Sequence, residues 1–402
     1  MIKRYLSAAG VGLLLIALAA SVAKNQVYEP VVVEEISTET ILSASEAYDI
    51  AIKNGADLLF WYNDESYESY FLDAAIAFYE KEGMVVDLEY VDDVDYVGSI
   101  YDATMEAGAF PDAYLLSGEE LEKAYLYGVA AMNQNKAAYQ NVVAENAINA
   151  SCYNEELYGY PLSYNVGVFV YNKNFFVEKP ASLQFLIDYS KQNEPSEDVQ
   201  YLLEWDAYDP FFDFAFISES VSFEKKEAEV LEVQYDEEML ETSMNFFKES
   251  LESFSLPIDT VTEESVLTDV LNGVTLCAIV DSDALKQLEA AEDYRVMEFP
   301  SLNDTLAARP AALTDMILVN DFSEKANVAS AFAQYLTLDY ANELWEKTGH
   351  YSVILSEDAN RNEQVAYNSY ENAVLVPNSQ DAAGFWIELK TMITKSFEEI
   401  DD

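Results

Sequence analysis

The chain has 402 residues, half of them apolar, and its 74 acidic against 21 basic residues give a formal net charge of −53. This length supports two or three domains with sizeable cores, and the composition is typical of a globular protein and not of a disordered one. So negative a surface repels phosphate backbones, which argues against nucleic acid as a partner and disfavours anionic ligands and anionic membrane surfaces.

The N-terminus combines positive charge with an apolar run. Lys3 and Arg4 precede an apolar stretch over residues 5–23. This order predicts a secretory signal or an N-terminal membrane anchor over residues 1–23, and the run is about long enough to span a bilayer. Residues 18–21 resemble the bacterial lipobox, but Ser21 stands where the lipidated cysteine must be. That serine excludes lipid attachment at this position.

Residues 24–54 are predicted to be a spacer that ends in a short helix. The spacer contains a proline, clustered acids and no sustained periodicity, as expected of a tether. Residues 44–53 place apolar side chains on one helical face, and Gly55 follows as a stop signal.

From residue 57 onward, strand patterns alternate with helical patterns. The predicted strands cover residues 57–62, 85–90 and 110–116, and the predicted helices cover 67–79 and 96–107 and begin again at 117. Strand, helix and strand of these lengths form a βαβ unit, which predicts a parallel sheet covered by helices. Ligands of such sheets lie beyond the carboxyl ends of the strands, where residues 61–64 and 116–120 are expected.

The stretch 157–176 is predicted to be the crossing between two lobes. Pro161 favours extended backbone before a near-continuously apolar, β-branched and aromatic run over residues 166–171. Such a run predicts a strand buried on both faces. Asn172, Lys173 and Asn174 end it with turn chemistry.

The alternation resumes beyond this crossing. Helices are predicted over 181–189, 235–250, 263–272, 282–291, 323–338, 362–371 and 385–397, and strands over 273–281, 294–299 and 316–319. Residues 205–212 form a dense cluster of aromatic and acidic side chains at the start of a further helix. Further crossings between the lobes are expected near residues 311–316 and near residue 360.

Motifs of catalysis and metal binding are scarce. His350 is the single histidine, so any Ser-His-Asp or Cys-His arrangement would have to include it. The sequence contains no GxSxG, HExxH, CxxC or P-loop motif. Two cysteines make neither a zinc site nor a disulfide framework. Cys277 lies in an apolar run and is expected in the core, whereas Cys152 and His350 receive no role.

Six segments carry a resemblance to a known family. In chain order they are DLLFWYND, FPDAYLLSGEELEKAYLYGVAAMN, LYGYPLSYNVGVFVYNK, YDPFFDFAF, LNGVTLCAIV and VPNSQDAAGFW. Together they resemble the extracellular solute-binding proteins of ABC importers, of the maltodextrin-binding type, over about residues 56–400. Each segment alone is a weak signal, and their order is what carries the resemblance.

The resemblance implies an α/β, two-lobe periplasmic-binding-protein-like fold, in which each lobe is a mostly parallel sheet flanked by helices and the hinge has multiple crossings. Residues 55–163 plus 314–358 would form the first lobe, and 164–313 plus 359–402 the second. The implied function is to bind an oligosaccharide between the lobes and deliver it to a membrane permease. The protein would be a monomer without enzymatic activity, cofactor or metal, anchored at or secreted from the extracellular face of the cytoplasmic membrane.

A carbohydrate site needs flat rings for the apolar sugar faces and carboxylates or amides for the hydroxyl groups. The resemblance places Trp386 at the position of a stacking ring, Phe211 at an aromatic position and Asp209 at the acid before it. Asp64, at the end of the first strand with Trp61 and Asn63, fits a carboxylate that binds hydroxyl groups.

Other positions depart from the family pattern. Leu116, Glu119 and Glu120 replace an aromatic, an acid and an arginine, Asn165 replaces a glutamate, and Asp283 stands where a stacking tryptophan is found. A binding role is therefore expected, but maltodextrin as the specific ligand is not. The expected ligand-binding residues are Trp61, Asn63, Asp64, Glu119, Glu120, Asn165, Asp209, Phe211, Asp283 and Trp386.

Other interpretations remain open. Acids and aromatic rings also build cation sites, so the solute could be a polyamine or a metal ion. A glycoside hydrolase needs two carboxylates across a cleft, but the two-lobe pattern is not the eightfold repeat of a barrel. Single residues have structural alternatives too: Trp61 and Trp386 could be core residues, and Glu119 with Glu120 could simply be an acidic first helical turn.

Overall fold

The structure is a computed structural model that describes residues 43–401, except 107, 194–198, 226–230, 257–259, 378 and 380–381. The predicted N-terminal segment over residues 1–23 and the spacer up to residue 42 lie outside the described residues. Within the described part of the chain, no helix is both long and apolar enough to cross a membrane.

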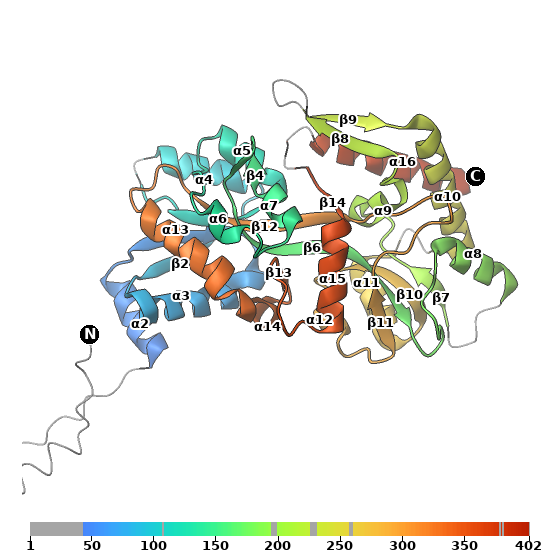
Figure 1. Ribbon diagram of the computed structural model, residues 1–402, viewed down its shortest axis with the longest axis horizontal. Coiled ribbons are helices and arrows are strands. Elements are labelled where there is room, and N and C mark those ends of the chain that lie inside the picture. Colours follow the sequence, from blue (N-terminus) through green and yellow to red (C-terminus); the bar gives the residue numbers. More distant parts are fainter. Residues whose placement is uncertain are drawn as a thin grey trace, which may run out of the picture. The chain divides into compact units, whose positions relative to one another are not determined.

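The first lobe is built on the parallel strands β2, β1 and β3 (Figure 1). Its elements are α2 (Ala44–Asn54), β1 (Leu58–Tyr62), η1 (Glu65–Tyr67), α3 (Glu68–Glu82), β2 (Val86–Tyr90), α4 (Tyr96–Met105), β3 (Ala113–Ser117), η2 (Gly118–Glu120), α5 (Leu121–Leu126), α6 (Lys136–Tyr139), α7 (Glu145–Ala150), β4 (Cys152–Tyr153) and β5 (Glu156–Leu157). The predicted βαβ unit and its parallel pairing are confirmed. Helix α2 packs on α3 and buries Tyr48, whose hydroxyl group donates to the carbonyl of Val86.

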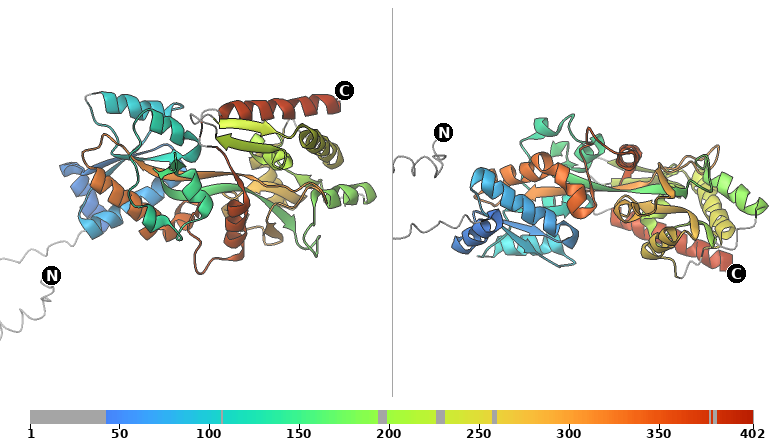
Figure 2. Two further views of the ribbon diagram at one scale, coloured as in Figure 1. Left: turned by 45° about the horizontal axis from the view of Figure 1, so that its top comes forward. Right: turned by 90° about the horizontal axis from the view of Figure 1, so that it is seen from below.

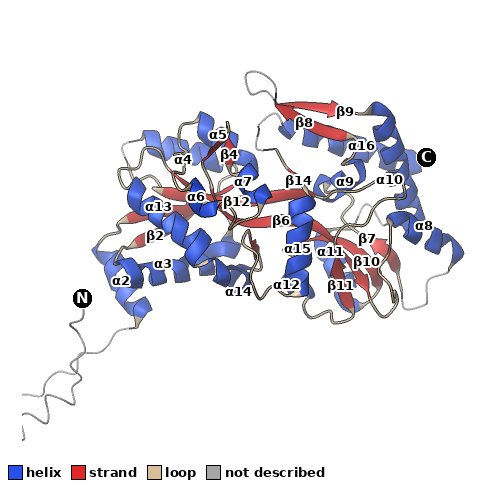
Figure 3. Ribbon diagram, viewed as in Figure 1, coloured by secondary structure: helices blue, strands red, loops and turns tan. Residues whose placement is uncertain are grey.

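The second lobe is built on β10 and β7, which pair in parallel. Its elements are α8 (Leu183–Gln192), β7 (Tyr201–Glu204), α9 (Pro210–Ile217), β8 (Val221–Lys225), β9 (Leu231–Tyr235), α10 (Glu237–Phe254), α11 (Glu263–Asn272), β10 (Thr275–Asp281), α12 (Leu285–Leu288), β11 (Tyr294–Met297) and, at the C-terminus, α16 (Ala382–Asp401). Figure 3 separates these helices and strands by colour.

The remaining elements join the lobes or return to the first one. They are β6 (Tyr160–Asn172), β12 (Ala311–Val319), α13 (Ala326–Gln334), η3 (Tyr335–Asp339), η4 (Ala341–Glu343), α14 (Leu344–Thr348), β13 (Tyr351–Ser352), α15 (Arg361–Asn372) and β14 (Val374–Leu375). Ten strands form one mixed sheet in the order β2-β1-β3-β12-β6-β10-β7, with β11 and β13 paired to β6 and β14 paired to β12.

Strand β6 is the central element of this sheet, as its sequence predicts. Its residues 160–166 pair antiparallel with β12, and residues 167–171 pair antiparallel with β10. Eleven of its 13 residues are buried, which matches the apolar run on both faces. The views in Figure 2 agree that α15 lies against the long central strands, and α15 contacts β6.

Three clusters of buried side chains form the core. One lies in the first lobe around Tyr114, and one lies in the second lobe around Trp205. The third runs from Phe60 in the first lobe through Val168 of β6 to Val280 in the second. The two lobes therefore share apolar packing along one face of the central strands.

Several predicted bounds differ from the structure. Strand β12 begins at Ala311 and not at 316, because Thr314 and Asp315 interrupt its apolar pattern but still pair with Tyr164 and Ser163 of β6. The helix predicted over 282–291 shrinks to four residues, Leu285–Leu288. The hairpin of β8 and β9 was missed, although the alternation of Val221 with Phe223 was a readable strand signal.

Candidate functional site

A polar pocket of about 440 Å³ lies at the carboxyl ends of β1 and β3. Its lining residues are Asn63, Asp64, Glu65, Tyr90, Leu115, Ser117 and Asp315. Asn63 and Asp64 were expected at this edge of the sheet. Asp64 also holds the local turn, because its Oδ1 accepts a hydrogen bond of 2.8 Å from the backbone N–H of Ser66 at the start of η1.

Asp315 lines this pocket and was missed by sequence reasoning, as were Glu65, Tyr90 and Leu115. It lies on β12 where the pairing with β6 shifts register between Asp315 and Met316, and such a bulge re-aims a side chain. The hydroxyl group of Tyr67 donates to Asp315 Oδ2 at 2.7 Å, and that of Ser163 does so at 3.3 Å. Burial raises the pKa of Asp315, although the Tyr67 bond lowers it in part. The available signal was a charged residue inside an apolar strand.

Glu119 lines a neighbouring pocket of about 200 Å³ whose floor is formed by β12 and β14. The other lining residues are Gly118, Asn149, Ala150, Phe223, Ala312, Leu313, Thr314, Leu375, Val376 and Pro377. These residues come from both lobes and from the crossing strands. Glu120 follows on η2, and its carboxylate lies 3.6 Å from the ammonium group of Lys123.

On the second lobe, Asn165 contacts the end of β10. Its Nδ2 donates to Asp281 Oδ2 at 2.7 Å, and its Oδ1 accepts from Ser282 Oγ at 3.3 Å. Glu263 lies beside Asp281, and burial together with that negative charge raises the pKa of Glu263 to about 8. Asp209 is close enough for its charge to raise the pKa of Glu263 further.

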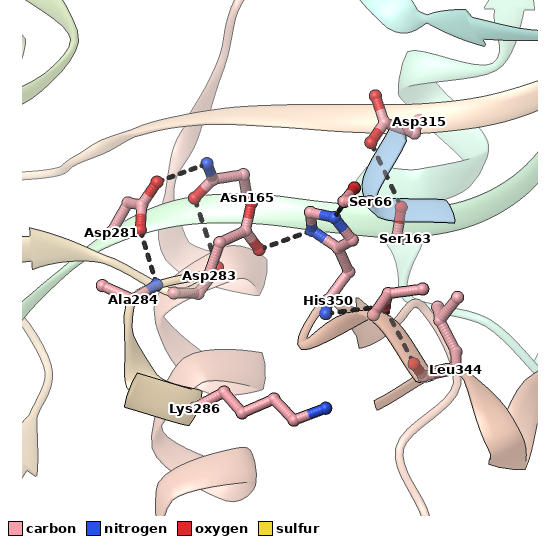
Figure 4. Close-up of polar contacts among 12 residues, drawn as sticks. Ser66, Ser163, Asn165, Asp281, Asp283, Ala284, Lys286, Asp315, Leu344 and His350 are labelled. Atoms are coloured by element: carbon pink, nitrogen blue, oxygen red, sulfur yellow. Dashed lines mark hydrogen bonds and ion pairs between the residues drawn. The ribbon is translucent and has the colours of Figure 1, made fainter. Parts of the chain in front are cut away.

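His350 connects this group to the pocket on the first lobe (Figure 4). Its Nδ1 lies 3.0 Å from Asp283 Oδ1, and its Nε2 lies 2.7 Å from Ser66 Oγ. The imidazole also stacks on the ring of Tyr67, with centroids 4.5 Å apart and planes 9° apart. Burial lowers the pKa of His350, but the bond to Asp283 and the charges of nearby carboxylates outweigh that effect and raise it overall.

Ser66, His350 and Asp283 have the connectivity of a serine hydrolase triad, which their positions in the sequence did not reveal. A triad also needs N–H donors where the oxyanion forms. The backbone N–H of Ser66 is instead bonded to the carboxylate of Asp64. This N–H is therefore already engaged and is not free to donate to an oxyanion beside Ser66.

The remaining expected residues lie at other positions. Trp61 is 9% exposed, packs in the first-lobe core and donates its indole N–H to Glu89 at 2.8 Å. Asp209 caps α9 by accepting from the backbone N–H of Phe211 at 2.9 Å. Phe211 and Trp386 are half-buried at the edge of the second-lobe aromatic core. Trp386 packs against Phe214 and Phe385, with ring centroids 5.9 and 5.1 Å away.

The acids of the site are not arranged as a metal centre. Among the described residues, no group of three or more His, Cys, Asp and Glu side chains is placed to hold a metal ion. Cys277 is buried in the core, as its sequence context predicts. What the arrangement offers is a row of oxygen and nitrogen groups that can exchange hydrogen bonds with a polar solute.

Comparisons with known proteins agree with this architecture. Residues 69–372 match the model of a family described as bacterial extracellular solute-binding protein. A galactooligosaccharide-binding protein of Bacillus subtilis (strain 168) is 28% identical over 171 residues, which are 42% of this chain and 38% of that protein. The match thus spans well under half the length of that relative.

Solved structures cover more of the chain. A cyclo/maltodextrin-binding protein complexed with maltotetraose has a TM-score of 0.70 at 19% identity, covering 85% of this chain and 96% of that one. A Thermus thermophilus maltotriose-binding protein bound with maltotriose has a TM-score of 0.67 at 16% identity, covering 85% and 94%. A Staphylococcus aureus extracellular solute-binding protein in complex with maltose has a TM-score of 0.69 at 16% identity, covering 86% and 98%. These likenesses confirm the predicted two-lobe α/β fold.

Proposed function

Because the chain belongs to the family of bacterial extracellular solute-binding proteins, we propose that it binds an oligosaccharide between its lobes and delivers it to the permease of an ABC importer. The observation that carries this proposal is the polar pocket with Asp64 and Asp315 at the carboxyl ends of the first-lobe strands. Carboxylates in such a pocket accept hydrogen bonds from several hydroxyl groups, which is what a sugar presents.

The sugar that fits is neutral. Asp64 and Asp315 face the solute from the first lobe, and Asp281 and Glu263 lie at the matching edge of the second. An anionic sugar would meet these like charges, so uronic acids and sugar phosphates are poor candidates. The relatives that bind galactooligosaccharide, maltotriose and maltose support a short, neutral oligosaccharide.

We propose that residues 55–163 plus 314–358 form the first lobe and residues 164–313 plus 359–402 the second, as predicted from the sequence. Crossings at β6, at β12 and around α15 permit a hinge rotation. A ligand that contacts both lobes stabilises the closed form, because only that form offers both sets of contacts. The closed, liganded form is what the permease subunits recognise, and the solute-binding protein itself performs no chemistry and acts as a monomer.

The N-terminal segment keeps the protein at the extracellular face of the membrane. Without a lipobox cysteine, residues 1–23 serve as an uncleaved anchor and the following residues as a tether. N-terminal sequencing of protein from its native membrane tests this assignment. A mature chain that starts at Lys24 would show that the segment is a cleaved signal and that the protein is secreted.

A cationic solute such as a polyamine is the second candidate. It is favoured by the row of acids Asp64, Asp315, Asp283 and Asp281, whose charges surround His350. Cations would be attracted by the same field that repels anions.

Isothermal titration calorimetry with a panel of solutes separates the two candidates. The panel contains malto- and galacto-oligosaccharides, a uronic-acid oligomer, spermidine and divalent metal ions. We expect saturable one-to-one binding of a neutral oligosaccharide and no binding of the uronic-acid oligomer. Saturable binding of spermidine or a metal ion alone would replace the carbohydrate proposal.

A further inference from the structure

The lobes touch at a place that does not involve the pairing of the crossing strands. The segment after β10 in the second lobe, residues 281–286, meets the end of α14 in the first lobe, residues 345–350 (Figure 4). Asp283 pairs with His350 there, with 3.0 Å between Oδ1 and Nδ1. Lys286 Nζ donates to the carbonyls of Trp345 at 2.8 Å and Glu346 at 2.7 Å, which are terminal carbonyls of α14.

We propose that His350 and Asp283 form a proton-controlled latch between the lobes, which favours the closed form when protonated and releases it, with weaker solute binding, when the proton is lost. The inference rests on the proposed function, because a latch has a role only if the lobes open and close around a solute. It assigns a regulatory role to the single histidine of the chain.

The histidine is held in place from three sides. Ser66 contacts Nε2, Asp283 contacts Nδ1, and Tyr67 lies flat against the ring. Ser66 and Tyr67 belong to the first lobe, so the imidazole is fixed on that lobe, and Asp283 is the partner that the second lobe supplies. A rotation that separates the lobes must therefore break the bond to Asp283 and leave the other two contacts intact.

The charges around the ring explain why the proton matters. Asp283, Asp315 and Asp64 all act on His350, and Asp281 acts on Asp283. A protonated imidazole places a positive charge among these carboxylates. A neutral imidazole leaves the carboxylates of both lobes without a compensating charge. The like charges then repel one another across the lobe boundary.

The direction of the pH dependence follows from both partners. The bond to Asp283 helps to raise the pKa of His350, and burial raises the pKa of Asp283 to about 7. Because both pKa values are raised, the pair retains a proton at a higher pH than the two groups would with their ordinary pKa values. The latch requires a proton in the pair, and it is lost as the pH rises and the pair releases that proton.

Lys286 provides a second contact between the same two segments. Its ammonium group donates to two terminal carbonyls of α14 and does not depend on the imidazole of His350 for either bond. Loss of the histidine proton therefore loosens the lobe contact without abolishing it. We expect a graded response and not an all-or-none opening.

The titration of His350 can be measured directly, because a tag-free protein contains one histidine. The Cε1–Hε1 resonance in carbon–proton correlation NMR spectra, recorded from pH 5 to 9, gives its pKa. We expect an apparent pKa above about 6.5 for the wild type and a fall when Asp283→Asn removes the partner. A wild-type pKa at or below that value, or no change in Asp283→Asn, would overturn the proposal.

Lobe opening is measured without solute, so that the result does not depend on sugar binding. Small-angle X-ray scattering of the ligand-free protein is compared at pH 5.5 and 8.5 for the wild type, His350→Gln and the control Asp339→Asn. The control removes an ion pair of 2.7 Å with Lys81 inside the first lobe. We expect a larger radius of gyration at pH 8.5 for the wild type and control, and a large value at both pH values for His350→Gln.

Equal radii at both pH values in the wild type, or a pH-dependent radius in His350→Gln, would contradict the latch. If His350→Gln does not fold, Asp283→Asn and the wild-type pH series supply the same comparison. The affinity for the oligosaccharide of the panel that binds most tightly should fall as the pH rises. The fall should be up to about tenfold for each unit by which the pKa of the His350–Asp283 pair differs between the open and closed forms. If the lobes open as the pH rises but the protein binds no sugar, the proposed function is refuted and the latch is not.

Discussion

At the scale of single residues, polar side chains in apolar surroundings define the site. Asp315 interrupts an apolar strand, Asp281 ends one, and Asn165 lies inside the buried strand β6. Each of them is a carboxylate or amide at a crossing strand or at a strand end. Burying such groups costs free energy unless they are hydrogen-bonded. The site can therefore form only because the fold supplies hydrogen-bond partners for them.

Asp315→Asn tests the pocket. The amide keeps an oxygen that can accept from Tyr67, so we expect the free energy of unfolding to change by less than about 1.5 kcal/mol. The lost charge should weaken binding of the cognate oligosaccharide about tenfold, or about 1.4 kcal/mol. Calorimetry measures the affinity, and Asp358→Asn on the exposed loop before α15 is the control. Equal affinities of the two variants would remove Asp315 from the site.

Trp386 tests whether an expected stacking residue binds the solute or only packs. Its ring packs on Phe214 and Phe385, so Trp386→Ala should lower the unfolding free energy by roughly 1–3 kcal/mol. Trp386→Phe keeps part of this packing and an aromatic face. We expect the alanine variant to lose affinity and the phenylalanine variant to retain most of it. If both variants bind as the wild type does, Trp386 is a core residue and the stacking ring lies elsewhere.

At the scale of elements, the periodic segments were predictable and the site was predictable only in part. The strands β1, β2 and β6 and the helices α3 and α11 follow from their apolar periods and their end signals. Asn63 and Asp64 were found because they follow a strand. The contact of His350 with Asp283 joins residues far apart in the sequence. Local sequence patterns do not predict contacts of this kind.

Gly349 illustrates how an element end prepares this contact. It terminates α14 with φ 88°, and a Cβ there would lie 3.1 Å from the Cδ atom of Lys286. Gly349→Ala should therefore destabilise the fold by about 1 kcal/mol or more, since the left-handed backbone and the lysine stem both oppose it. Gly384→Ala, inside α16 with nothing within 4 Å of its added Cβ, should instead stabilise by up to about 1 kcal/mol. Urea unfolding measures both, and a neutral Gly349→Ala would contradict this description of the α14 end.

At the scale of the whole molecule, buried acids tie stability to pH. Burial raises the pKa of Glu204 to about 7 and, with the charge of Asp281, that of Glu263 to about 8. Acids with raised pKa stabilise the fold while protonated, and this contribution is lost as the pH rises from about 4.3 through the folded-state pKa. The net charge of −53 acts in the same direction, because acids that lose protons increase the self-repulsion.

We therefore expect the protein to be more stable at pH 5.5 than at pH 8.5. Urea unfolding across this range measures the difference, and Glu204→Gln should reduce the slope because it removes one titrating group. Glu298→Gln on the exposed surface is the matched control. Stability that rises with pH would mean that these carboxyl groups ionise freely in the folded protein.

We propose that a neutral oligosaccharide binds between the lobes with its hydroxyl groups on Asp64 and Asp315. A crystal structure of the complex with the oligosaccharide that binds most tightly in calorimetry shows where the sugar lies. We expect sugar hydroxyl groups within hydrogen-bond distance of Asp64 or Asp315 on the first lobe and further contacts from the second lobe. A sugar bound to one lobe alone, or bound outside the pocket that contains Asp315, would contradict it.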